Sequence, residues 1–279
     1  MKNKITLWLV FLTIILNNQL AYSKPNILVT ITPIASIVAM LTKDKADIVI
    51  LDTSGGCPHH HSAKPSDKSL IDNSEMVIYI DDQFDSLVSS MLLNYKGKKV
   101  RISDFSSINF KGIDGQHNWH FWLDLNNVKL ILKDIADNII KTFPEIKKEV
   151  TKNLAESYII IDNLDKLKQS KLVKLESSVL LSDSLEHFFK SINNSEVKVF
   201  DISNASLKNI QKLDDVLSSE SLKCIVLDVN QNSQSYSKYN KLIIQLDSEN
   251  WTLKDKTNIS GNLFVDQYSK MINLVESCK

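Results

Sequence analysis

Apolar residues along this chain form short unbroken runs that alternate with stretches in which apolar positions recur every three to four residues. In the first half, β-rich runs occupy residues 27–31, 47–51, 76–80 and 98–102. Helical periodicity marks the stretches between them, at residues 34–41, 68–73 and 83–93. Strands that alternate with helices are typical of a parallel sheet with crossover helices. We therefore predict an α/β fold with a four-stranded, mainly parallel sheet in this half.

The most amphipathic stretch follows the fourth predicted strand. Apolar side chains recur there at Val128, Ile131, Leu132, Ile135, Ala136, Ile139 and Ile140. This spacing predicts a helix that Asp124 or Asn126 caps. Pro144 interrupts the pattern, and a second helical run covers residues 145–169. A helix of that length spans about 35 to 40 Å, so we expect it to be a rigid connector between two halves.

The second half repeats the alternation of the first. Predicted strands cover residues 178–181, 196–200, 224–227 and 242–246, and predicted helices cover residues 183–192, 206–217 and 263–275. Each half therefore predicts one four-stranded, mainly parallel sheet. We divide the chain into an N-terminal α/β lobe at 24–143, a connecting helix at 144–170 and a C-terminal α/β lobe at 171–279.

The N-terminus, residues 1–23, has the layout of a secretory signal peptide. Lys2 and Lys4 precede an apolar run over residues 5–16, and small residues occur in Ala21-Tyr22-Ser23. The run is shorter than the roughly 18 to 20 residues that cross a bilayer, which favours cleavage over a retained anchor. No cysteine follows the run as a lipid-attachment site. We expect export to the periplasm and a free, soluble mature protein.

The net charge of the mature chain limits the classes of molecule that it is expected to bind. The chain has 33 basic and 33 acidic residues, and removal of the two signal-peptide lysines leaves 31 basic residues, a net charge of about −2. Such a balance does not indicate the basic face of a nucleic-acid-binding protein. Glycine and proline are scarce, at six and five residues, and no low-complexity linker separates the halves. We expect a two-lobed monomer.

Candidate chemistry concentrates in the segment Cys57-Pro58-His59-His60-His61. Five of the six histidines fall within residues 59–61 and 117–120. Imidazole and thiolate bind zinc, copper or nickel well, whereas calcium and magnesium favour oxygen ligands. The alternative is a histidine run that lines a solvated loop, because adjacent side chains cannot all point toward one ion.

The predicted strands place several polar side chains at one edge of each sheet. His59 follows the second strand and His120 follows the fourth, while Ser182 and Asp247 follow strands of the second half. Open α/β sheets bind ligands just beyond the carboxyl ends of their strands. We therefore expect these side chains to face a common cleft between the lobes.

Five features carry a resemblance to a known family. They are Cys57-Pro58-His59 with Lys64-Pro65-Ser66-Asp67, His120-Phe121-Trp122-Leu123-Asp124, Ser182-Asp183 through Phe188, Leu246-Asp247, and the pair Cys224 and Cys278. The first four resemble the ligand segments of the periplasmic metal-binding proteins of zinc and manganese ABC importers. The cysteine pair is similar to one in the zinc-specific members. The chain resembles the zinc-binding ZnuA group in particular, over nearly its whole mature length.

By position, the resemblance implies that His59, His120 and Asp247 are metal ligands. Ser182 stands where the family has its third ligating histidine, and a hydroxyl binds zinc poorly compared with imidazole. His187 lies five residues further along, about 140° around a helix axis from Ser182, so we do not expect it to substitute. The candidates left open for the remaining place are Cys57, His60, His61, Ser182 itself and a water molecule.

Export to an oxidising compartment allows two of the three cysteines to form a disulfide. The pair Cys224 and Cys278 is favoured because Cys57 lies inside the candidate metal site, and the resemblance implies the same pair. In the chain-entropy model a loop of that length stabilises the fold by about 4 kcal/mol.

The resemblance implies a function as well as a fold. It indicates a periplasmic solute-binding protein, not an enzyme, that captures Zn²⁺ between its lobes and delivers it to the membrane permease of a zinc ABC importer. One alternative is the same fold with an altered site that binds Mn²⁺ or another metal, or a partner. Another is a secreted zinc hydrolase, which also needs three protein ligands and an open position. The chain has neither a His-Glu-x-x-His helix nor a Gly-x-Ser-x-Gly elbow, which disfavours the hydrolase.

Overall fold

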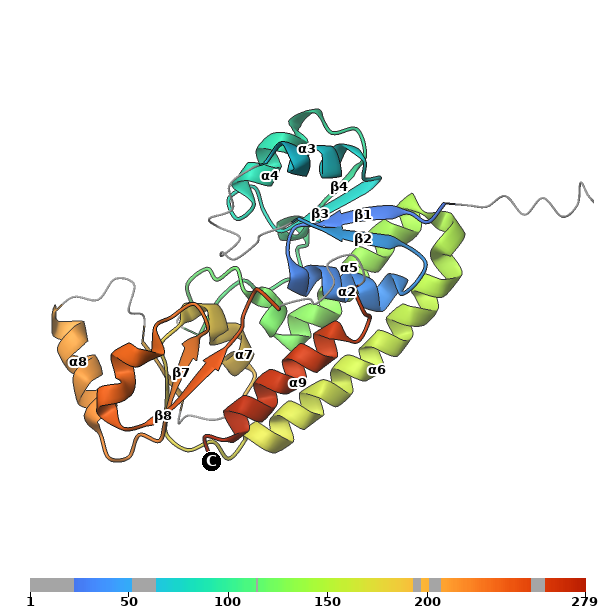
Figure 1. Ribbon diagram of the computed structural model, residues 1–279. Coiled ribbons are helices and arrows are strands. Elements are labelled where there is room, and N and C mark those ends of the chain that lie inside the picture. Colours follow the sequence, from blue (N-terminus) through green and yellow to red (C-terminus); the bar gives the residue numbers. More distant parts are fainter. Residues whose placement is uncertain (1–22, 52–63, 114, 193–196, 201–206, 252–258) are drawn as a thin grey trace, which may run out of the picture.

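Two parallel sheets flanked by helices form two lobes, and long helices connect them (Figure 1). The computed structural model describes residues 23–51, 64–113, 115–192, 197–200, 207–251 and 259–279. The predicted signal peptide lies almost entirely outside these residues. Within them, no helix is both long and apolar enough to cross a membrane. The α/β two-lobe prediction is confirmed.

The N-terminal sheet has the strand order β2-β1-β3-β4, and every pairing is parallel. Its strands are β1 (Asn26–Val29), β2 (Asp47–Ile50), β3 (Met76–Tyr79) and β4 (Lys98–Arg101). The helices of this lobe are α2 (Thr32–Thr42), α3 (Pro65–Asp72) and α4 (Ser86–Met91). All four residues of β3 are buried, because helices cover both faces of a parallel sheet. This explains why the strand is a continuous apolar run.

The C-terminal sheet repeats this topology, with the parallel order β6-β5-β7-β8. Its strands are β5 (Ser178–Leu180), β6 (Val197–Val199), β7 (Cys224–Asp228) and β8 (Leu242–Leu246). Its helices are α7 (Glu186–Lys190), α8 (Leu207–Ser218) and α9 (Leu263–Glu276). The helix predicted at 183–192 is shorter in the structure, because a 3-10 turn at Asp183–Leu185 precedes α7.

Two helices follow β4 and its irregular loop. The first is α5 (Leu125–Thr142), whose start Asp124 caps by accepting a hydrogen bond of 2.9 Å from the backbone nitrogen of Asn126. Pro144 then begins a short 3-10 turn, and α6 (Lys147–Leu172) follows it. As predicted, α6 links the lobes: it packs against α2 of one lobe and α9 of the other (Figure 1).

The largest hydrophobic core is shared by both lobes. It includes Ile27 and Ile78 from the N-terminal sheet, Val226 and Leu246 from the C-terminal sheet, and Ile161 of α6 between them. Two smaller clusters lie on the other faces of the two sheets. Protein interiors are close-packed, so a shared core resists rotation of one lobe against the other.

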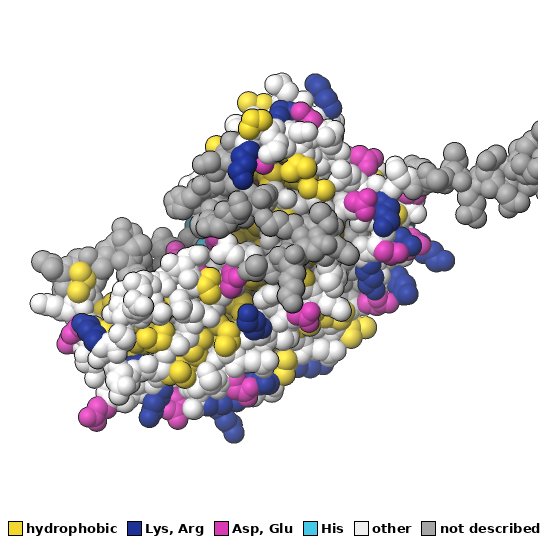
Figure 2. All heavy atoms as spheres, in the orientation of Figure 1, with side chains coloured by type: hydrophobic (Ala, Val, Ile, Leu, Met, Phe, Trp, Pro, Cys, Tyr) yellow, Lys and Arg dark blue, Asp and Glu magenta, His cyan; other side chains and the backbone are white. Residues whose placement is uncertain are grey.

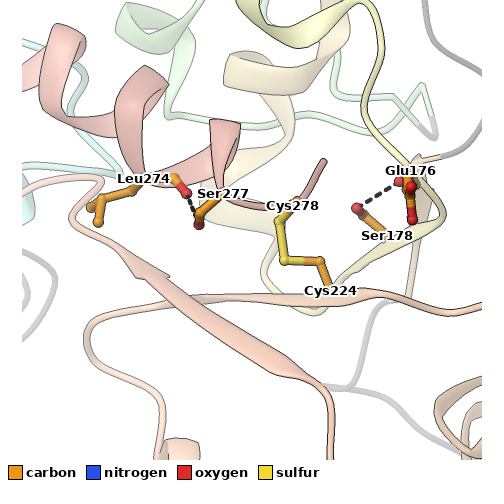
Figure 3. Close-up of a disulfide and its surroundings, with 6 residues drawn as sticks. All are labelled: Glu176, Ser178, Cys224, Leu274, Ser277 and Cys278. Carbon is orange, nitrogen blue, oxygen red and sulfur yellow. Dashed lines mark hydrogen bonds between the residues drawn. A yellow bond between two sulfur atoms is a disulfide. The ribbon is translucent and has the colours of Figure 1, made fainter.

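A disulfide closes the C-terminal lobe. Cys224 at the start of β7 is bonded to Cys278 just beyond α9, with a Cα separation of 5.6 Å (Figure 3). Both cysteines are buried. The predicted cysteine pair is thus confirmed, and it ties the last helix to the sheet that leads into the loop after β8.

Candidate metal centre

The segment at residues 115–124, which we call the bridging segment, leaves the N-terminal lobe and lies against the C-terminal lobe. The side-chain amide of Asn118 donates to the carbonyl oxygen of Asp183 over 2.7 Å. The indole nitrogen of Trp122 donates to the carbonyl oxygen of Ser248 over 2.9 Å. Trp122 is fully buried. These contacts hold the bridging segment, and with it His120, at the junction between the lobes.

The ring of His120 is oriented by its neighbour in the bridging segment. Asn118 Oδ1 accepts from the backbone nitrogen of His120 over 2.9 Å, and its amide nitrogen faces Asp183, which fixes which way the amide points. The same Oδ1 lies 3.0 Å from His120 Nδ1, so Nδ1 carries a proton and donates it. The other ring nitrogen, Nε2, is therefore the one that a metal ion can bind.

His120 Nε2 faces a buried carboxylate of the other lobe. It lies 2.5 Å from Oε1 of Glu249, a residue 129 positions further along the chain. Glu249 is 4% exposed and His120 is 9% exposed. Figure 2 shows histidine atoms beside acidic side chains at the junction between the lobes. A nitrogen and an oxygen donor from different lobes thus meet at one point.

A turn after β8 determines where Glu249 points. Asp247 Oδ1 accepts from the backbone nitrogens of Glu249, over 3.2 Å, and Asn250, over 2.7 Å. The indole of Trp251 donates to the carbonyl oxygen of Asp247 over 2.9 Å. Such a turn is a common local use of an aspartate side chain. Burial raises the pKa of Asp247, because desolvation disfavours its charged form.

Ser182 belongs to a chain of hydrogen bonds on the same edge of the C-terminal sheet. Its hydroxyl lies 2.7 Å from the hydroxyl of Ser184, which donates to Asp228 Oδ2 over 3.2 Å. The hydroxyl of Ser248 donates to the same oxygen over 2.6 Å. Asp228, the last residue of β7, therefore anchors the loop after β8. The Ser182 hydroxyl is engaged in this network.

The two other described histidines contact residues between Phe110 and Trp119. His187 is fully buried, with Nε2 3.3 Å from the carbonyl oxygen of Asn118. Burial lowers the pKa of His187 to about 4, so the ring is neutral. His117 is exposed, and its ring stacks on Phe110 and contacts Trp119.

The predicted site residues are only partly covered by the described chain. His120, Asp247 and Ser182 are described, and Cys57, His59, His60 and His61 lie outside the described residues. Among the residues described, no group of three or more His, Cys, Asp and Glu side chains could hold a metal ion. The ligand roles of His59, His120 and Asp247 stay a prediction. The sequence interpretation missed Glu249, although its place two residues after Asp247 was an available signal.

Comparison with known proteins identifies the family. Residues 27–272 match the family model of ZnuA, described as zinc-uptake complex component A, periplasmic. An uncharacterized protein of Rickettsia prowazekii is 43% identical over 261 residues, which cover 92% of this chain and 85% of that protein.

Two further proteins are similar to this chain in sequence or in fold. The iron ABC transporter substrate-binding lipoprotein MtsA of Streptococcus pyogenes is 27% identical over 173 residues, 56% of this chain and 55% of that protein. The structure of the periplasmic zinc-binding protein TroA of Treponema pallidum superimposes with a TM-score of 0.75 at 18% identity, covering 92% and 99% of the two chains. The homologues of this family are substrate-binding proteins of transporters and not enzymes, which agrees with the expectation that this chain is not a hydrolase. This chain belongs to the ZnuA family of metal-binding solute-binding proteins.

Proposed function

We propose that this protein captures Zn²⁺ at the junction between its lobes, in the periplasm, and delivers it to the membrane permease of an ABC importer. The observation that carries the proposal is His120, whose ring Asn118 fixes so that Nε2 faces a buried carboxylate of the other lobe. Imidazole nitrogen and carboxylate oxygen are donors that zinc favours in proteins. The placement between two lobes suits an ion that must later be released.

Further ligands are proposed from position. His59 comes after β2 in the sequence, outside the described residues, and Asp247 lies in the turn that carries Glu249. Asp247 uses Oδ1 for the backbone of its own turn, and a carboxylate has a second oxygen for an ion. Zinc commonly takes four protein or water ligands in a tetrahedron.

Release would follow from small movements near the site. The shared core and α6 oppose a large rotation of the lobes. The turn after β8 and the bridging segment contact each other through a few hydrogen bonds, so a shift of either would separate donors of different lobes. A shift of about 1 Å suffices to weaken coordination, because metal-ligand distances tolerate only about 0.2 Å.

A second candidate is a site for Mn²⁺ or Fe²⁺. Ser182 offers a hydroxyl where the resemblance places a third histidine, and that hydroxyl is engaged with Ser184. A site with fewer nitrogen donors has a smaller ratio of Zn²⁺ affinity to Mn²⁺ or Fe²⁺ affinity, since carboxylate and hydroxyl oxygens suit harder ions. Zinc still stands above manganese and iron in the Irving-Williams order at a site that keeps any imidazole.

Calorimetric titration of the metal-stripped protein tests the proposal. We expect one Zn²⁺ per chain, bound more tightly than Mn²⁺ or Fe²⁺ under anaerobic conditions. Tighter binding of Mn²⁺ or Fe²⁺ than of Zn²⁺ would favour the second candidate. Absence of heat and of thermal stabilisation with all three ions at neutral pH would overturn both.

A further inference from the structure

His120 Nε2 and Glu249 Oε1 face each other at the junction between the lobes, 2.5 Å apart. Asn118 Oδ1 lies 3.0 Å from the other ring nitrogen, Nδ1, so Nε2 is the ring atom that points toward Glu249. Both side chains are buried, at 9% and 4% exposure. Imidazole nitrogen and carboxylate oxygen are both zinc donors, so an ion that enters between them meets one donor from each lobe.

We propose that Glu249 is a ligand of the bound metal ion and supplies the donor that Ser182 does not. This inference rests on the proposed function, because it concerns the same ion. Zinc bonds of about 2.0 to 2.2 Å to nitrogen and oxygen place two ligand atoms roughly 3 to 3.5 Å apart. The side chains therefore have to separate by only about 1 Å or less from their present contact.

The backbone around Glu249 is held in place on both sides. The preceding residue, Ser248, donates its hydroxyl to Asp228 and accepts from the Trp122 indole. The backbone nitrogen of Glu249 itself donates to Asp247. A ligand on a fixed backbone loses little conformational freedom when the ion binds. Glu249 is thus preorganised, and its 4% exposure keeps competing water away.

The chemical type of this ligand affects which metal ion the site binds most tightly. A carboxylate in place of an imidazole is a harder donor, so it narrows the advantage of Zn²⁺ over Mn²⁺. Glu249 would therefore set selectivity as well as affinity. A Glu249→His variant, which returns a nitrogen donor at this point, is expected to widen the ratio of Zn²⁺ to Mn²⁺ affinity.

The test compares two buried glutamates at the lobe junction. Glu186 is also 4% exposed, and its Oε2 accepts from the backbone nitrogen of Ile113 over 2.9 Å. Calorimetry with Zn²⁺ should show at least about a hundredfold loss of affinity in Glu249→Gln, because a residue that only supports a ligand costs about tenfold to a hundredfold. Glu186→Gln should stay within about threefold of the wild-type protein.

Three outcomes are distinguishable. If the wild-type protein binds Zn²⁺ and Glu249→Gln binds it equally well, Glu249 is not a ligand while the proposed function stands. If the wild-type protein binds no metal, the proposed function itself fails. Should circular dichroism show that Glu249→Gln does not fold, crystals of the zinc-loaded wild-type protein decide: an Oε–Zn distance of about 2.0 to 2.2 Å supports the inference, and one beyond about 3 Å overturns it.

Discussion

The indole nitrogen of Trp122 donates a hydrogen bond of 2.9 Å to the carbonyl oxygen of Ser248, across the junction of the two lobes. Trp122 is fully buried and Ser248 is 1% exposed. Each partner lies next to one half of the candidate site, because His120 is two residues before Trp122 and Glu249 directly follows Ser248. The bond therefore aligns the bridging segment with the turn after β8.

Replacement of Trp122 by phenylalanine should loosen this alignment. The variant leaves the carbonyl oxygen of Ser248 buried without its donor, which costs about 1 to 3 kcal/mol of unfolding free energy. We expect metal affinity to fall several-fold as well, measured by urea unfolding and calorimetry. Trp119→Phe is the control, since the Trp119 ring makes edge contacts with Phe84 and Phe110. Equal metal affinity in both variants would show that the bond does not support the site.

Asp247 can be tested for two separate roles. Asp247→Asn keeps an oxygen that accepts from the backbone of the turn, and it removes the negative charge. If Asp247 is a ligand, the asparagine variant loses about tenfold or more in Zn²⁺ affinity with little change in stability. Asp247→Ala should in addition lower the unfolding free energy by about 1 kcal/mol, as loss of a turn or cap hydrogen bond does. Wild-type metal affinity in Asp247→Asn would assign this residue to the turn alone.

Lys168 on α6 should make stability depend on pH. Its side chain is fully buried, with Nζ 2.8 Å from the hydroxyl of Ser191 and 3.1 Å from that of Tyr268. Desolvation lowers the pKa of Lys168 from 10.5 to about 7. Between these values the unfolded chain binds a proton that the folded chain has released, so stability rises with pH through this window.

The variant Lys168→Met should remove that rise. We expect the wild-type unfolding free energy to increase from pH 7 to pH 10 by up to about 4 kcal/mol relative to the variant, measured by urea unfolding. Lys171→Met, at a lysine of the same helix paired with Glu276 on the surface, should keep the wild-type pH dependence. Parallel curves for the wild-type protein and Lys168→Met would contradict a lowered pKa.

The disulfide between Cys224 and Cys278 should contribute strongly to stability. The two cysteines are 54 positions apart, and closing such a loop restricts the unfolded chain by about 4 kcal/mol in the chain-entropy model. Reduction of the wild-type protein should therefore lower the urea midpoint. The double variant Cys224→Ser, Cys278→Ser should unfold at that lower midpoint with or without reductant. An unchanged midpoint on reduction would mean that the bond restrains little.

Much of the fold follows from local patterns. β3 and β7 are buried along their whole length, so their apolar runs identify them within one or two residues. The helix predicted at 83–93 is less accurate: it becomes α4 and a separate 3-10 turn at Leu92–Asn94. Helix ends depend on single hydrogen bonds, which periodicity does not encode.

The candidate site could be predicted from the sequence only in part, because its contacts join distant segments of the chain. His120 could be found because it belongs to a motif, and Asp124 because it precedes a helical pattern. Glu249 reaches His120 through a turn that the carboxylate of Asp247 shapes, across 129 positions of sequence. A contact that depends on the packing of two lobes has no local signature in the chain.

Zinc titration of a matched pair of histidine variants tests the central claim most directly, namely that the ion lies at the junction beside His120. His120→Ala removes the ring that faces Glu249, and His117→Ala removes an exposed ring three residues earlier in the bridging segment. By calorimetry we predict a loss of at least about a hundredfold in Zn²⁺ affinity for His120→Ala and less than about threefold for His117→Ala. Wild-type affinity in the His120→Ala variant would contradict the account.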